Sequence, residues 1–170
     1  MASRTGEQTL RAILRPFDGI GSTRYVDFDT TRDVYRTDPA KSQIEYVVLD
    51  SGWEAKMAQA LEEMDEVVCY AKNLNVGFTI PYTFDGAERL YFPDYLVRFD
   101  DGHGPDDLLN LVVEVSGEAR KDKAAKTAAA RTLWIPAVNN HGGYGRWAFL
   151  EITDPWDAKN TIRAMLSQQT

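Results

Sequence analysis

The chain of 170 residues has few of the residues that build disulfide frameworks, zinc sites or membrane spans. Its single cysteine, Cys69, excludes an internal disulfide, and with two histidines, His103 and His141, a Cys/His zinc site is not expected. No apolar run approaches the ~20 residues of a membrane-spanning helix, and the N-terminal residues lack the apolar segment of a signal peptide. These absences predict a soluble cytoplasmic protein with no membrane partner.

Basic residues are also scarce, since 19 Lys and Arg face 26 Asp and Glu and the formal net charge is −7. Nucleic-acid binding normally requires a basic surface, so this charge argues at first against a nucleic-acid partner. The one basic cluster lies in residues 118–131, which hold five basic and two acidic residues. The hydrophobic share of 44% and the charged share of 26% are those of an ordinary globular domain.

Hydrophobic patterning becomes regular after Ile44. Helices are predicted at 53–65, at 119–134, ending ahead of Pro136, and at 154–167. Strands are predicted at 44–50, 66–73, 76–82, 88–100, 108–117 and 145–152, with a turn at 100–107. The order of these elements predicts an α/β fold with a mixed sheet between helices. The four tryptophans are expected in the core, because each has apolar neighbours: Trp53, Trp134, Trp147 and Trp156.

Two acidic residues lie in apolar strand segments, where a lone carboxylate is costly to bury. Glu114 lies on the strand face opposite Leu111 and Val113 by the two-residue period. Asp94 follows Pro93, which cannot donate to a sheet ladder and favours a bend that would turn Asp94 toward a neighbouring strand. Taken singly, Asp94 is typical of a turn and Glu114 of an exposed sheet edge. Together they are candidate oxygen ligands for a hard divalent cation such as Mg²⁺.

The order of these residues resembles the PD-(D/E)XK nuclease superfamily. Pro93-Asp94 matches the PD element, Glu114-Val115-Ser116 matches the (D/E)XK element, and Glu54 matches an acidic residue that many members carry in the first helix. A closer resemblance, over roughly residues 45–165, is to the C-terminal nuclease region of the restriction (Res) subunit of type III restriction enzymes. The segments that carry it are SGWEAKMAQAL, FTIPY, YFPDYLV, LNLVVEVSGE, DKAAKTAAARTLWIPAVNN and FLEITDPWDAKNTI.

The resemblance implies a restriction-endonuclease-like α-β-β-β-α-β core and a Mg²⁺-dependent DNA endonuclease that hydrolyses phosphodiester bonds, with Mn²⁺ able to substitute. Asp94, Glu114 and the Val115 carbonyl would hold one or two ions, which lower the pKa of a bound water. Glu54 is either an outer ligand or a helix-start carboxylate favoured by the helix dipole. Residues 1–45 are interpreted as an N-terminal extension with short strands, part of the same domain, and residues 46–170 as the nuclease domain.

One position departs from the family pattern, because Ser116 stands where the family has a lysine. Serine can hydrogen-bond a water but supplies no positive charge. The resemblance implies that the lysine can come from elsewhere in the chain, and the basic residues of the following helix offer a replacement. Lys123 is predicted to act, with Lys126 second. The alternative is that this helix face is simply solvated.

Three further residues are predicted to contact DNA. Arg120 and Lys121 belong to the basic cluster beside the predicted metal site. His141 lies in the glycine-rich segment 138–147, predicted to be a loop that approaches the nucleic-acid backbone.

The implied partners are double-stranded DNA and a motor protein. The chain has no GxxxxGK[ST] phosphate loop, so it is not the motor itself. A helicase or translocase domain or subunit of a restriction system is expected to present the DNA, and a homodimer is one way to cut both strands. The alternative, motivated by Ser116, is a degenerate, inactive nuclease fold that serves as a DNA-binding or assembly module. A purely structural domain fits the charge but leaves the paired acids unexplained.

Overall fold

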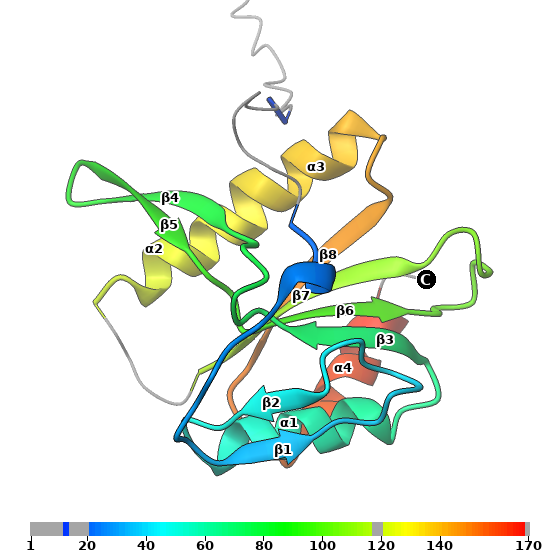
Figure 1. Cartoon of the computed structure of the whole chain (residues 1–170). Coiled ribbons are helices and arrows are strands. Elements are labelled where there is room, and N and C mark those ends of the chain that lie inside the picture. The colour runs from blue at the N-terminus through cyan, green and yellow to red at the C-terminus, as the bar shows by residue number, and fades with distance from the viewer. Residues whose placement is uncertain (1–11, 14–20, 117–120, 169–170) are drawn as a thin grey trace, which may run out of the picture.

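A four-stranded mixed sheet forms the centre of the molecule (Figure 1). The computed structural model describes residues 12–13, 21–116 and 121–168. The sheet has the order β3-β6-β7-β8, with antiparallel pairing up to β7 and a parallel β7–β8 pair. Its strands are β3 (Val67–Lys72), β6 (Tyr95–Phe99), β7 (Leu109–Val115) and β8 (Arg146–Ile152). The predicted α/β class with a mixed sheet is confirmed. No described helix is long and apolar enough to cross a membrane.

Helices cover both faces of this sheet (Figure 1). On one face α1 (Gly52–Glu62) and α4 (Ala158–Ser167) pack on Leu111 and Val113 of β7. On the other face Val112 of β7 packs with residues of the long helical segment that follows β7. That segment consists of α2 (Lys123–Ala128), η2 (Ala129–Trp134) and α3 (Ile135–His141). The alternation along β7 therefore separates two apolar clusters, as the two-residue period predicts.

Helix α1 begins where the sequence predicts and is held by a capping box. Ser51 Oγ accepts a hydrogen bond from the Trp53 N–H at 3.2 Å, and Glu54 Oε2 accepts one from the Ser51 N–H at 2.9 Å. Such reciprocal bonds satisfy backbone donors that the first helical turn leaves free. Met57 and Leu61 of the predicted apolar stripe are fully buried.

The predicted strand at 88–100 is wrong, since the chain forms two strands there that belong to different sheets. β5 (Ala87–Tyr91) pairs with β4 (Ile80–Phe84) in a hairpin, whereas β6 pairs with β3 and β7. Phe92, Pro93 and Asp94 form the break between them. A second hairpin, β1 (Val34–Arg36) with β2 (Tyr46–Val48), and the short helix η1 (Thr23–Tyr25) precede α1.

The helix after β7 does not end ahead of Pro136, as predicted, but continues to His141. Proline lacks an N–H and its ring clashes with the carbonyl four residues back, which normally ends a helix. Here the turns before Pro136 widen into a π-helix, and the Ile135 N–H bonds to the Ala130 carbonyl five residues back. The wider turn lets the helix axis pass the proline.

The tryptophan prediction is wrong for one residue. Trp134 and Trp147 pack at the edge of one apolar cluster, and Trp53 is half-buried. Trp156, however, is 63% exposed, with its ring 6.3 Å from that of Trp53 at a right angle. It lies between β8 and α4, outside both cores.

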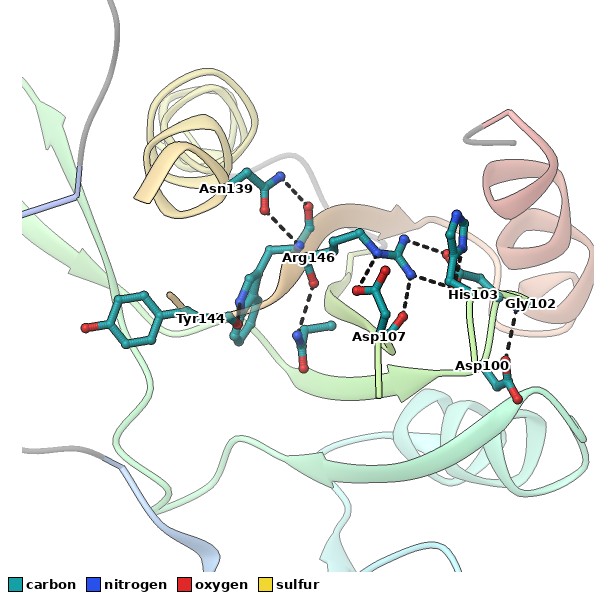
Figure 2. Close-up of polar contacts among 10 residues, drawn as sticks. Asp100, Gly102, His103, Asp107, Asn139, Tyr144 and Arg146 are labelled. Carbon is teal, nitrogen blue, oxygen red and sulfur yellow. Dashed lines mark hydrogen bonds and ion pairs between the residues drawn. The ribbon is translucent and has the colours of Figure 1, made fainter. Parts of the chain in front are cut away.

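Arg146, the first residue of β8, ties the predicted turn after β6 to the sheet (Figure 2). Its guanidinium donates two hydrogen bonds to the Asp101 carboxylate, at 2.7 and 2.8 Å, and two to Asp107, at 3.0 Å to Oδ1 and 2.6 Å to the backbone carbonyl. Hydrogen bonds from Arg146 hold the pKa of Asp101 well below its usual range despite partial burial. These bonds anchor the β6–β7 turn and the start of β8 together.

Candidate active site

A cavity of about 900 Å³ opens where the start of α1, the Asp94 break, the end of β7 and the first turns of α2 meet. Asp94, Glu114, Ser116 and Glu54 all line it. The fold thus brings together acids that lie up to 60 residues apart in sequence. Its volume falls within the ~300–1,000 Å³ typical of ligand clefts.

Asp94 and Glu114 form the centre of the site, and their carboxyl groups lie close enough for each to affect the ionisation of the other. The break after Pro93 turns Asp94 so that its Oδ2 accepts the Val115 N–H at 2.8 Å. Glu114 Oε2 accepts a hydrogen bond from the Tyr91 hydroxyl at 2.6 Å. The predicted convergence of the two acids across β6 and β7 is therefore present.

The electrostatics of this pair disfavour ionisation of both acids at once. Burial, followed by repulsion from Asp94, raises the pKa of Glu114 to about 7. Burial also raises the pKa of Asp94, although the Val115 N–H and the charge of Lys72 oppose that rise. Two close carboxylates in a poorly solvated place share a proton because both cannot ionise cheaply. A divalent cation relieves the same repulsion, so this pair is suited to bind one.

The two carboxylates are suited to Mg²⁺ or Mn²⁺, which can bind with few protein ligands, and not to a metal that needs many side chains. Within the described ranges, no group of three or more His, Cys, Asp or Glu residues could hold a metal ion. Mg²⁺ is commonly bound by one or two carboxylates, with waters and substrate phosphate completing its shell. Asp94 and Glu114 supply those two carboxylates, and Val115 also lines the cavity.

Both carboxylate oxygens of Glu54 have partners. Oε2 completes the α1 capping box, as the helix-start interpretation requires, while Oε1 lies 3.9 Å from Nζ of Lys72. Lys72, the last residue of β3, was not predicted as a site residue. Its ammonium is largely buried, donates to the Val48 carbonyl at 3.1 Å and adds positive charge behind the acids. The only sequence signal for it is a lone lysine at the end of an apolar strand.

Ser116, in the position of the family lysine, contacts another residue that sequence reasoning missed. Its hydroxyl donates to Oε1 of Glu151 at 2.6 Å, and Nζ of Lys123 lies 2.6 Å from the same oxygen. Glu151 is opposite Glu114 in the parallel β7–β8 register. Burial opposes its ionisation, but the bonds from Lys123 and Ser116 outweigh burial and lower the pKa of Glu151. One carboxylate oxygen therefore connects the serine to the first residue of α2.

Lys126, the second predicted lysine, also lines the cavity. Its Nζ pairs with Asp122 at 3.0 Å and lies 5.8 and 5.9 Å from the ring centres of Tyr82 and Tyr91. Its charge partly offsets the rise in the pKa of Glu114. Both lysines of α2 thus line the cavity, and each is paired with a carboxylate: Lys123 with Glu151, and Lys126 with Asp122.

The predicted DNA contacts have different outcomes. Arg120 lies outside the described residues, and Lys121 is exposed just before α2. The predicted loop at 138–147 is partly wrong, because residues up to His141 belong to α3. The His141 ring packs on Tyr144, its Nδ1 accepts the Gly143 N–H at 3.2 Å, and it does not line the cavity. No contact in the described part of the chain connects His141 with the acids.

Comparison with known proteins gives one family match. A family model described as an endonuclease domain matches residues 40–135, more than half of the chain. The matched segment contains Glu54, Asp94, Glu114 and both lysines of α2, whereas Glu151 lies beyond it. No curated protein and no solved structure matches the chain.

Proposed function

Because the chain belongs to the endonuclease-domain family, we propose that it is a metal-dependent DNA endonuclease that hydrolyses phosphodiester bonds in the cytoplasm. The observation that carries this proposal is the buried Asp94–Glu114 pair, which lies in a cavity with two lysines. A structural role alone does not account for two buried carboxyls that raise each other's cost of ionisation, because such a pair costs stability.

The cofactor in this proposal is Mg²⁺, with Mn²⁺ able to replace it. Asp94 and Glu114 hold the ion, and the Val115 carbonyl is the third protein ligand. Bound there, the ion supplies an acidified water and neutralises charge on the phosphate. Tyr91 keeps its proton, since burial raises its pKa, and so orients Glu114 by donating to it. The Val115 N–H does the same for Asp94.

The positive charge that the family lysine supplies comes from α2 in this proposal. Lys123 is the first candidate, because Glu151 Oε1 holds its ammonium beside the Ser116 hydroxyl. Glu151 is then a positioning residue that compensates for Ser116. Lys126 is the second candidate, placed over Tyr82 and Tyr91. Glu54 steadies the start of α1 and holds Lys72 near Asp94.

The resemblance to the nuclease region of type III Res subunits suggests the wider setting. In it, a helicase or translocase domain or subunit of a restriction system delivers double-stranded DNA to this domain. The net charge of −7 supports this dependence, since the chain alone attracts a phosphate backbone weakly. Lys121, which is exposed just before α2, would contact that backbone next to the site, and Arg120 keeps the same proposed role from its place in the sequence. Two copies acting on opposite strands would produce a double-strand break.

The alternative proposal is an inactive nuclease fold that binds DNA or assembles a complex, and Ser116 is the observation that favours it. Two measurements separate the alternatives. The purified chain is incubated with supercoiled plasmid and Mg²⁺ or Mn²⁺, and Mn²⁺ binding is followed by calorimetry.

An active site predicts nicking and Mn²⁺ binding that both disappear in Asp94→Asn. The matched control is Asp106→Asn, which removes an exposed aspartate in the β6–β7 turn. Metal binding without nicking favours the inactive module, and nicking that survives Asp94→Asn refutes the site.

A further inference from the structure

One wall of the active-site cavity is apolar and exposed. Leu90 and Phe92 line the cavity and are 54% and 60% exposed, and Trp53 lines it from the start of α1. Large apolar side chains exposed to water in a concave site are a common mark of ligand contact. We call Trp53, Leu90 and Phe92 the apolar wall.

The apolar wall is attached directly to the carboxylate pair. Tyr91, between Leu90 and Phe92, is 3% exposed and donates its hydroxyl hydrogen bond to Glu114. Asp94 follows Phe92 by two residues. Because Tyr91 turns inward, its two neighbours lie on the outer side of the same chain segment. A molecule held by the acids therefore lies next to Leu90 and Phe92.

The remaining walls of the cavity carry charge. Lys123 and Lys126 of α2 line it together with Asp94 and Glu114. A ligand that matches every wall needs two groups. An anionic group would contact the lysines and a cation held by the acid pair, and a flat apolar group would contact Phe92. A nucleotide has both, since its phosphate is anionic and its base has a π-face that stacks on aromatic rings. A partner protein would match the apolar wall alone.

We infer that the apolar wall stacks on an unpaired nucleobase adjacent to the phosphate that the site cleaves, so that the domain prefers DNA with unpaired bases over intact duplex. This inference rests on the proposed nuclease function. In intact B-form DNA the bases are paired and stacked and cannot reach Phe92. A single strand, a gap or the strands opened by a motor expose them.

Binding measurements on the full chain test this inference. The Asp94→Asn variant, which prevents cutting, is titrated against labelled single strand, intact duplex and a strand of the same length with abasic sites. We expect tighter binding to the single strand than to the duplex. Base stacking on an aromatic ring accounts for about a 5- to 150-fold loss of affinity when the ring is removed.

The variants are chosen to identify stacking. In the Asp94→Asn background, Phe92→Ala should lower the affinity for the single strand by about 5- to 150-fold and leave the affinity for the abasic strand unchanged. Phe92→Trp should retain the affinity, and Leu90→Ala gives an independent, smaller loss. Leu133→Ala is the matched control, because Leu133 is 54% exposed like Leu90 but lies on η2 outside the cavity.

The outcomes separate this inference from the proposed function. The inference is overturned if Phe92→Ala binds the single strand as tightly as its parent, or if it loses the same affinity for the abasic strand as for the single strand. The apolar wall is then a surface for another protein. Plasmid nicking by the unmutated chain in that case leaves the nuclease function standing. If the chain never nicks DNA but Phe92→Ala still shows base-dependent loss of affinity, the nuclease function fails and only base stacking on the apolar wall of an inactive binding module remains.

Discussion

Replacing Glu114 by Gln should make the metal-free protein more stable above neutral pH. In the folded protein, burial and repulsion from Asp94 raise the pKa of Glu114 from 4.5 to about 7. A carboxyl whose pKa is raised by folding opposes folding when it ionises, so stability falls as the pH rises from 4.5 through about 7. Gln resembles the protonated acid and cannot ionise, so Glu114→Gln removes this loss.

The size of the effect follows from the shift. Each pKa unit corresponds to about 1.36 kcal/mol, so the full shift sets an upper limit of about 3 kcal/mol at a pH above both values. The Glu114 side chain is only partly buried, and Tyr91 hydrogen-bonds its charged form. We therefore expect a gain of about 1–3 kcal/mol at about pH 8 and no difference at about pH 4.

Urea unfolding with EDTA at several pH values measures this gain. Glu151→Gln is the matched control, because the pKa of Glu151 is lowered by Lys123 and Ser116. Its ionised form stabilises the fold above about pH 4.5, and that stability is lost as the pH falls below 4.5 through the lowered pKa, so this variant should be less stable at about pH 8. The reasoning is wrong if Glu114→Gln is destabilised at that pH, or if its effect does not change with pH.

Three further predictions concern the metal, the lysine and the far end of the sheet. Mn²⁺ at about 100 times its Kd should stabilise the parent by about 2.7 kcal/mol in thermal unfolding and leave the stability of Glu114→Gln nearly unchanged. If both proteins are stabilised equally, the ion binds elsewhere. Lys123→Met should slow plasmid nicking about 100-fold, and adding Ser116→Lys should restore part of it; a double variant no faster than Lys123→Met contradicts the proposed replacement. Arg146→Met should lower the free energy of unfolding by about 1.5–3 kcal/mol without changing nicking per folded molecule, whereas slower nicking at full stability would give Arg146 a role at the site.

Elements specified by nearby residues were predictable. The start of α1 depends on Ser51 and Glu54, three residues apart, and β7 alternates between two apolar clusters within seven residues. The turn after β6 follows from its local Gly, Pro and Asp content. The local bend at Pro93 was also visible, because proline removes a ladder donor wherever it stands.

Predictions failed where a local pattern fits two pairings equally well. Residues 88–100 are rich in aromatic and aliphatic side chains on both sides of Pro93, and the partners of each half assign it to β5 or β6. By the local rule, a helix ends before Pro136. Packing nevertheless continues past this proline, because buried or half-buried side chains lie before it, at Trp134 and Ile135, and after it, at Val138. The π-turn accommodates the proline while that packing is kept.

By itself the sequence determined the class of fold, the order of the elements and the two acids, because each depends on residue type and short spacing. Only the tertiary structure decided the surroundings of those acids. Glu151 lies 37 residues after Glu114, and the parallel register of β7 and β8 alone makes them neighbours. Strand register, unlike a helical stripe, is set by contacts between distant segments, and the raised pKa values of the two acids follow from the burial that those contacts create.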